Sequence, residues 1–252
     1  MEEFTMGMKL ENVTGGYTQL PVLKDLSFEV NNGEVVGLIG LNGAGKSTTL
    51  KHIIGLLEPH TGRITLNGQT INENRENYRK DIGYIPETPA LYEELTLREH
   101  INVTAMAYGI SEEEAHRRAE PLLDMFRLNE RLDWFPAYFS KGMKQKVMIV
   151  CALLIDPSNL IIDEPFLGLD PLGIRDLLFL IMEKKEQGTA ILMSTHVLST
   201  AEKYCDRFII LHEGKIRAEG TLTELQQVFN QPGASLDDLY VSLTEEGAAI
   251  DI

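Results

Sequence analysis

Cysteines, basic residues and long apolar runs are all scarce in this chain of 252 residues. The 2 cysteines, Cys151 and Cys205, stand among apolar neighbours. We therefore expect small buried side chains in a reducing compartment, and neither a disulfide nor a metal pair. The 23 basic residues face 38 acidic ones, which gives a net charge of -15. This balance argues against nucleic acid as a partner, because binding to a phosphate backbone requires clustered Lys and Arg.

Signals for membrane insertion or export are also missing. The longest apolar run, at 147–155, is much shorter than the roughly 20 residues that cross a bilayer. The acidic positions 1–9 contain no apolar signal segment. We expect a soluble chain that is not exported.

Apolar runs bounded by turn residues predict an α/β chain with a parallel sheet and crossover helices. The predicted strands cover 9–14, 26–30, 35–39, 64–66, 82–85, 160–163, 190–195 and 208–211. Pro86 ends the strand at 82–85 and indicates an edge or terminal position. Asn67-Gly68 and Glu213-Gly214 indicate hairpin turns.

Helical patterns dominate two segments. Between 96 and 126 no strand signal occurs, and capping boxes open two helices, which predicts an inserted helical lobe. A two-helix tail follows the last hairpin. The four predicted boxes are Thr96 with Glu99, Ser111 with Glu114, Thr221 with Glu224, and Ser235 with Asp238. A further helix begins near Gly45, and its apolar stripe consists of Leu50, Ile53, Ile54 and Leu57.

A glycine-rich loop joins the strand at 35–39 to that helix. It has the pattern G-x4-G-K-[ST] and consists of Gly40, Leu41, Asn42, Gly43, Ala44, Gly45, Lys46 and Ser47, followed by Thr48. Its backbone N–H groups and the helix N-terminus can bind phosphates. Lys46 is expected to pair with the β- and γ-phosphates, and the Ser47 hydroxyl to bind Mg²⁺. The loop thus predicts a bound nucleotide.

Two carboxylates, Asp163 and Glu164, follow the predicted strand at 160–163. Alone, such a pair is more often a solvated turn. Together with the loop, it supplies what a nucleotide hydrolase needs: Asp163 to hold Mg²⁺ and Glu164 to act as general base on the attacking water.

These motifs, in this order, resemble the ATP-binding cassette ATPases, the nucleotide-binding subunits of ABC transporters, over about 8–244. The resemblance implies that Tyr17 stacks on adenine, that Ser140 and Gly142 form the signature segment, that Asp170 belongs to the D-loop, and that His196 senses the γ-phosphate. Lys46, Glu164 and His196 are then the catalytic residues. Alone, Tyr17 and His196 would be ordinary core or surface residues.

The resemblance also implies a P-loop NTPase (RecA-like) core with a mixed sheet, an antiparallel β subdomain and an inserted helical subdomain. We expect an ATPase domain over 8–220, with its nucleotide-binding core at 8–87 and 157–220 and its helical subdomain at 88–156. The helical tail is expected at 221–252.

The chain departs from the family pattern at two sites. In the signature, Lys141 and Met143 replace the usual Gly and Gln, while Ser140 and Gly142 remain. Glu87 stands where the family usually has a Gln that touches Mg²⁺ and the attacking water. A carboxylate there can bind the metal but repels the γ-phosphate without it, so we expect activity that depends more strongly on Mg²⁺.

The resemblance implies ATP and Mg²⁺ as ligands, a homodimer around two ATP molecules, and a polytopic membrane subunit as partner. The segments 86–89, 139–146 and 165–171 are most similar to the EcsA-type subunits of bacterial exporters, and the tail at 236–244 is similar to the tails of exporter-type cassettes. This resemblance implies a place on the cytoplasmic face of the membrane. The alternative is a soluble cassette ATPase without a membrane subunit, although no second cassette or coiled-coil insertion occurs in the sequence. A P-loop GTPase or small-molecule kinase would leave the signature segment unexplained.

Overall fold

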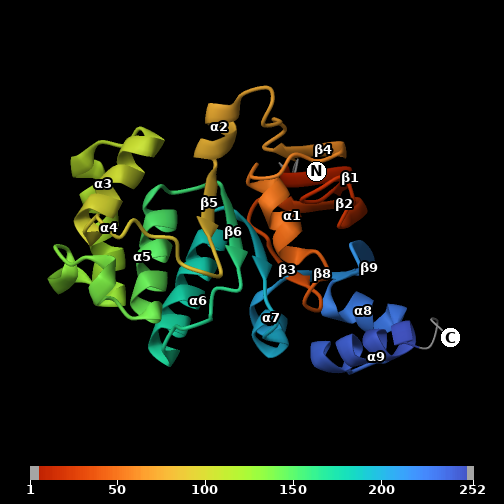
Figure 1. Ribbon diagram of the computed structural model, residues 1–252. Helices are drawn as coiled ribbons and strands as arrows, with labels where there is room; N and C mark the ends of the chain where they lie inside the picture. The colour runs from red at the N-terminus through yellow and green to blue at the C-terminus, as the bar shows by residue number, and fades with distance from the viewer. Residues whose placement is uncertain (1–5, 249–252) are drawn as a thin grey trace.

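Two sheets form the centre of the protein (Figure 1). The computed structural model describes residues 6–248. A three-stranded antiparallel sheet has the order β2-β1-β4, with β1 (Met6–Gly15), β2 (Leu23–Asn31) and β4 (Thr61–Leu66). A six-stranded sheet has the order β5-β6-β7-β3-β8-β9 and is parallel except for the last pair. Its strands are β3 (Val35–Ile39), β5 (Ile82–Ile85), β6 (Asn159–Asp163), β7 (Ala190–Ser194), β8 (Arg207–His212) and β9 (Lys215–Gly220).

The predicted strands are confirmed, and β5 is an edge strand as its terminal proline suggested. The two predicted turns differ in outcome. Glu213 and Gly214, with φ of 47° and 78°, join β8 to β9 in a hairpin. Asn67 and Gly68 also have positive φ, but the turn is closed by one isolated bridge from Leu66 to Gln69. The chain then leaves the sheet, so this turn starts no second strand.

Helices flank both sheets. The longer ones are α3 (Leu97–Tyr108), α4 (Glu112–Phe126), α5 (Lys141–Leu154), α6 (Pro171–Glu186) and α9 (Leu236–Ala248). Shorter helices are α1 (Lys46–Ile53), α2 (Arg75–Lys80), α7 (Leu198–Tyr204) and α8 (Leu222–Val228), with 3-10 turns at Asn129–Arg131 and Pro136–Tyr138. The patterns in the sequence predict neither α2 nor α7. Each is held by its neighbours, since helices this short are marginal alone.

The predicted N-caps all lie at helix starts. Thr96, Thr221 and Ser235 each exchange hydrogen bonds with the acidic residue three positions later. Ser111 is different. It accepts from the amide of Glu114, but the Glu114 carboxylate bonds to Arg117 and Arg118 instead of reaching back. These two guanidinium groups lower the pKa of Glu114 to about 2. The second half of this capping box was a wrong prediction, because charged donors compete successfully for the carboxylate.

Helix α1 ends at Ile53, before the predicted stripe reaches Leu57. Gly55 takes the left-handed conformation, with φ of 70°. The amides of Gly55 and Leu57 fold back onto the carbonyls of His52 and Lys51. A left-handed glycine with backward hydrogen bonds is a common helix stop, and it overrides the apolar periodicity.

The apolar core has three parts. The largest joins α3, α4 and α5 to one face of the six-stranded sheet, the second fills the space between the two sheets and α1, and the third lies under α7, α8 and α9. Cys151 and Cys205 are free thiols that pack partly buried against the core. Within residues 6–248, no helix combines the length and apolar character needed to cross a bilayer.

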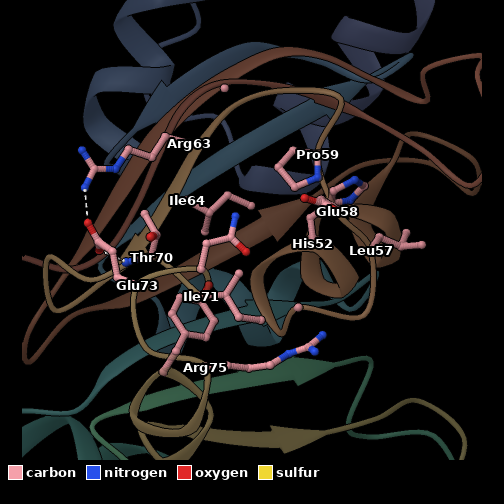
Figure 2. A pocket seen from close by; sticks show the side chains of 14 residues that line it. His52, Leu57, Glu58, Pro59, Arg63, Ile64, Thr70, Ile71, Glu73 and Arg75 are labelled. Carbon is pink, nitrogen blue, oxygen red and sulfur yellow. Dashed lines mark hydrogen bonds and ion pairs between the residues drawn. The ribbon is translucent and has the colours of Figure 1, made fainter.

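A cavity of about 750 Å³ opens at the C-terminal end of α1 (Figure 2). Its walls come from the segment after α1, from β4 and from the loop that leads to α2. On one side Arg63 lies within 3.7 Å of Glu73. Tyr78 also lines the cavity. It is 2% exposed, and its hydroxyl donates to the carbonyl of Ile53 at 2.7 Å. Burial raises the pKa of Tyr78. This hydrogen bond ties α2 to the end of the phosphate-loop helix.

Substitution of Tyr78 tests that tie. Tyr78→Phe removes the hydroxyl and leaves the buried Ile53 carbonyl without its donor, so we expect the free energy of unfolding to fall by about 1–3 kcal/mol. Tyr138→Phe is the matched control, because Tyr138 is 70% exposed. Urea unfolding of both variants measures the difference. Equal midpoints for Tyr78→Phe and Tyr138→Phe would show that α2 is held by packing alone.

Candidate functional site

Three neighbouring strands end at the same edge of the parallel sheet. In register, Ser194 of β7 lies opposite both Asp163 of β6 and Leu38 of β3. The glycine-rich loop follows β3, Glu164 follows β6, and His196 follows β7. The carboxyl ends of parallel strands are where ligands bind in open α/β sheets. The topology therefore gathers motifs that are far apart in the sequence.

A cavity of about 380 Å³ lies at this edge. Of the predicted site residues, its lining includes Gly40, Leu41, Asn42, Lys46, Ser47, Glu87, Glu164 and His196. Among the described residues, the predicted ones outside its lining are Tyr17, Gly43, Ala44, Gly45, Thr48, Ser140, Gly142, Asp163 and Asp170. The larger cavity of Figure 2 lies at the opposite end of α1 and contains no residue of the loop.

The loop presents its backbone to this cavity. Gly43 and Gly45 have φ of 86° and 111°, and α1 begins without a side-chain cap. The first amides of a helix have no intrahelical partner and carry partial positive charge. Lys46 is 7% exposed, and its ammonium group donates to the carbonyl of Gly40 at 2.7 Å. A buried lysine, free amides and a helix N-terminus form a site that fits an anion with several oxygens, such as a polyphosphate.

The oxygens of Ser47 and Asp163 lie together beside the loop. The Ser47 hydroxyl is 3.3 Å from Oδ1 of Asp163, and the Ser194 hydroxyl donates to the same oxygen at 2.6 Å. A hydroxyl and a carboxylate are the hard oxygen ligands that Mg²⁺ takes alongside phosphate and water. No group of three or more His, Cys, Asp and Glu that could hold a metal exists within residues 6–248. The oxygens of Ser47 and Asp163 therefore fit Mg²⁺ whose other ligands are phosphate oxygens and water.

Glu164 is held in a strained and nearly buried position. Its φ is 46°, and its side chain is 11% exposed. The amide of Glu164 donates to the carbonyl of Ser194, and Oε2 accepts from both the backbone amide and Nδ1 of His196, at 3.1 and 2.7 Å. Oε1 is 4.0 Å from the ammonium of Lys46. A left-handed conformation in a residue other than glycine costs free energy and is typical of functional sites.

Glu87 is exposed on the far wall of the cavity, in the loop after β5. Next to it, Gln145 of α5 is fully buried and donates from Nε2 to the carbonyl of Pro86 at 2.9 Å. Burial, and then the negative charges of Asp163 and Glu87, raise the pKa of Tyr84. The loop that carries Glu87 therefore lines the cavity and is held to α5 by the hydrogen bond from Gln145.

Tyr17 lies beside α1, in the connection between β1 and β2. It is 56% exposed, and its hydroxyl accepts from the Lys51 ammonium at 3.1 Å. Partial burial alone would raise the pKa of Tyr17, but hydrogen bonds with Lys51 and Thr48 lower it. Thr48 is itself buried, and its carbonyl bonds to the ring of His52. An exposed ring on this side of the loop is available for stacking.

The segment around Ser140 and Gly142 forms the start of α5. Ser140 is exposed and caps the helix by accepting from the amide of Met143 at 3.2 Å. Gly142 packs against the carbonyl of Gly168, so closely that an added Cβ would lie 2.2 Å from that oxygen. The aliphatic part of Lys141 lies beside Gly168. Of the two usual glycines of the signature, the chain keeps Gly142, and at this position there is no room for a side chain.

Asp170 ties the same loop to α5. It caps α6 by accepting from the amide of Gly173 and lies 3.0 Å from the ammonium of Lys146. Lys146 is 9% exposed. Its hydrogen bond lowers the pKa of Asp170, and the amide of Gly173 adds to the effect. The start of α5 thus packs against the loop that ends at Asp170. Glu164 and Leu167 of that loop line the phosphate cavity, whereas Ser140, Gly142 and Asp170 do not.

Sequence reasoning missed several contributors to the site. Ser194 holds Asp163, while Gln145 and Lys146 link α5 to the loops at 86–87 and 168–170. For Gln145, the available signal was a polar residue soon after the signature segment, in a helix whose other inward positions are mostly apolar. Ser194 carried no signal beyond its place at a strand end.

Comparison with known proteins gives a consistent result. The ABC transporter family matches at residues 23–167. The ABC-type transporter ATP-binding protein EcsA of Bacillus subtilis (strain 168) is 61% identical over 241 residues, which cover 96% of this chain and 98% of that protein. A solved structure of an ATP-binding subunit of an ABC transporter has a TM-score of 0.91 and 59% identity, covering 94% of this chain and 99% of its own.

A second solved structure shows a similar protein in its dimeric form. It is an ATP-binding cassette in a post-hydrolysis state, bound to ADP and Pi, with a TM-score of 0.76 and 29% identity. The match covers 85% of this chain and 98% of the other. The resemblance to ATP-binding cassettes, and to the EcsA type among them, is confirmed.

The contact between Gly142 and Gly168 leads to a stability prediction. Gly142→Ala places a methyl group against a rigid backbone carbonyl, and we expect the free energy of unfolding to fall by about 1–3 kcal/mol through overpacking. Lys141→Ala is the control at the adjacent position, because it removes atoms near Gly168 and adds none. Thermal and urea unfolding distinguish the two. A Gly142→Ala protein as stable as Lys141→Ala would mean that the loop at 168–170 moves freely from α5.

Proposed function

This chain belongs to the ABC transporter family and is an ATP-binding subunit with ATPase activity, and we propose that two copies close around two ATP molecules and drive export through a polytopic membrane partner. The observation that carries the proposal is the meeting of Lys46, Glu164 and His196 in one cavity at the phosphate loop. A phosphate-binding site alone would not require a buried carboxylate and a histidine at its end.

We assign the phosphates of ATP to the backbone amides of the loop from Gly40 to Thr48 and to Lys46. The Lys46 ammonium lines the cavity and would exchange its hydrogen bond to the Gly40 carbonyl for one to a phosphate oxygen. Tyr17, exposed beside α1, is the proposed platform for adenine. Ser47 and Asp163 would hold Mg²⁺, with Glu87 within reach on the cavity wall. Bound there, Mg²⁺ would neutralise charge on the phosphate oxygens.

Glu164 is the proposed general base for the attacking water. Its low exposure and its contacts with His196 and Lys46 fix the carboxylate at the cavity. The side chain of His196 is 61% exposed and can turn from Glu164 toward a terminal phosphate. Proton acceptance by Glu164 and a hydrogen bond from His196 to the developing charge are the roles this geometry supports.

Ser140, Gly142 and Asp170 are proposed to act across a dimer interface. They lie outside the lining of the cavity in their own chain and form the surface at the start of α5. The N-terminus of α5 would present its dipole and the Ser140 hydroxyl to the ATP of the other copy. A dimeric structure of a similar cassette supports this arrangement.

We divide the chain into a nucleotide-binding core at 8–87 and 157–220, a helical subdomain at 88–156 and a tail at 221–252, of which 249–252 lie outside the described residues. The helices α3, α4 and α5 pack together in one apolar core, which also joins them to the six-stranded sheet. We place the protein on the cytoplasmic face of a membrane, docked through the helical subdomain and the loop that carries Glu87. Co-purification of a polytopic membrane protein with the tagged chain tests the partner, and a soluble partner alone would favour the cassette without a membrane subunit.

Glu164→Gln tests the general base and the dimer together. Removing the base should lower the rate of ATP hydrolysis by about 100-fold or more and preserve binding, so dimers accumulate with MgATP. Glu58→Gln, at the other cavity, is the charge-matched control. Steady-state hydrolysis and size-exclusion chromatography with and without ATP give both readouts. Monomeric Glu164→Gln with wild-type turnover would refute the assignment.

Glu87→Gln tests the unusual carboxylate. Loss of one negative charge near the terminal phosphate should strengthen ATP binding without Mg²⁺ by about 3- to 10-fold, since a screened pair of charges is worth on the order of 1 kcal/mol. The Mg²⁺ dependence of hydrolysis should become shallower at the same time. Titrations of Mg²⁺ at fixed ATP compare wild type with variant, and superimposable curves would remove Glu87 from the metal site.

A further inference from the structure

The C-terminal helix reaches the phosphate cavity. Tyr240 of α9 lines it together with Lys46, Glu164 and His196, although it lies far along the chain from all three. Figure 1 shows α9 beside α7 and α8, on the side of the sheet where β3 ends. A residue of the tail therefore forms part of the wall around the reacting groups.

The ring of Tyr240 packs against an apolar cluster that includes Ile39 and Leu198. Both of these residues also line the cavity. Ile39 is the last residue of β3, directly before the loop, and Leu198 is the first residue of α7, two positions after His196. The ring thus touches the cluster that supports the bases of the phosphate loop and of the histidine loop. Partial burial raises the pKa of the Tyr240 hydroxyl.

Helix α9 is fixed to α7 at its start. The amide of Leu236 donates to Oε2 of Glu202 at 2.7 Å, and Leu236 and Leu239 are fully buried in the same cluster. The two helices are in contact. Helix α9 therefore packs on the helix whose first residue, Leu198, follows the His196 loop.

We propose that Tyr240 is a positioning residue for ATP hydrolysis, whose ring supports Leu198 and thereby keeps His196 aligned with Glu164 and the terminal phosphate. The proposal rests on the proposed roles of Glu164 and His196. The groups proposed to bind ATP are the loop amides and Lys46, whose ammonium is held by the carbonyls of Gly40 and Leu41. Loss of the ring should therefore affect kcat and leave KM for ATP nearly unchanged.

The test compares the purified full-length chain with Tyr240→Ala, Tyr240→Leu and Tyr240→Phe. Tyr240→Ala should lower kcat by about 10-fold, because small misplacements of catalytic groups are costly, while KM changes less than about 2-fold. Tyr240→Phe keeps the ring and should retain at least about half of wild-type kcat. Tyr240→Leu preserves apolar volume and serves where the alanine variant does not fold. Val228→Ala, on α8 and 61% exposed, is the control.

The outcomes separate this inference from the proposed function. Wild-type kcat in Tyr240→Ala or Tyr240→Leu overturns the role of the ring, and so does an equal loss in Tyr240→Phe. A rise in KM without a fall in kcat would place Tyr240 in binding and also overturn the proposal. If Glu164→Gln retains full activity, the proposed site fails whatever the Tyr240 variants do.

Discussion

The alignment of three strand ends is the constraint on which the site depends. Ser194 lies opposite both Asp163 and Leu38, and its hydroxyl bonds to Asp163 at 2.6 Å. Because parallel strands in register end together, the loop after β3, the carboxylates after β6 and the histidine after β7 must meet. A slip of one residue in this pairing would turn Asp163 to the other face of the sheet and separate it from Ser47.

Local fields outweigh the charge of the whole molecule at this edge. The chain carries a net charge of -15, which repels a polyphosphate. Within the cavity, however, Lys46 is almost fully buried, the first amides of α1 are uncapped, and Glu164 is paired with His196. Charges interact more strongly where water is excluded, so these few groups decide what binds. The strain at Glu164 is part of the same arrangement, since its left-handed backbone directs the carboxylate to His196.

Helix α5 connects the remaining parts of the molecule. Gln145 holds the loop beside Glu87, Lys146 holds Asp170, and Gly142 packs on Gly168. Helix α5 thereby contacts the loops at 86–87 and 168–170 and carries Ser140 at its start. The tail makes a comparable link on the other side through Tyr240 and α7. Of these two elements, α9 contributes Tyr240 to the lining of the cavity, and α5 contacts the loops beside it.

Sequence alone was enough to predict the strands, the phosphate loop and the caps at Thr96 and Thr221, because each rests on a short-range pattern of residues. The family followed from the order of the motifs along the chain. The sequence could not determine that α1 stops at Gly55, that Glu114 prefers arginine partners, or that Asn67-Gly68 starts no second strand. Nor could it bring Ser194, Gln145, Lys146 and Tyr240 to the site. Their contacts join residues far apart in the chain, and only the packing of sheet, helices and tail decides which of them meet.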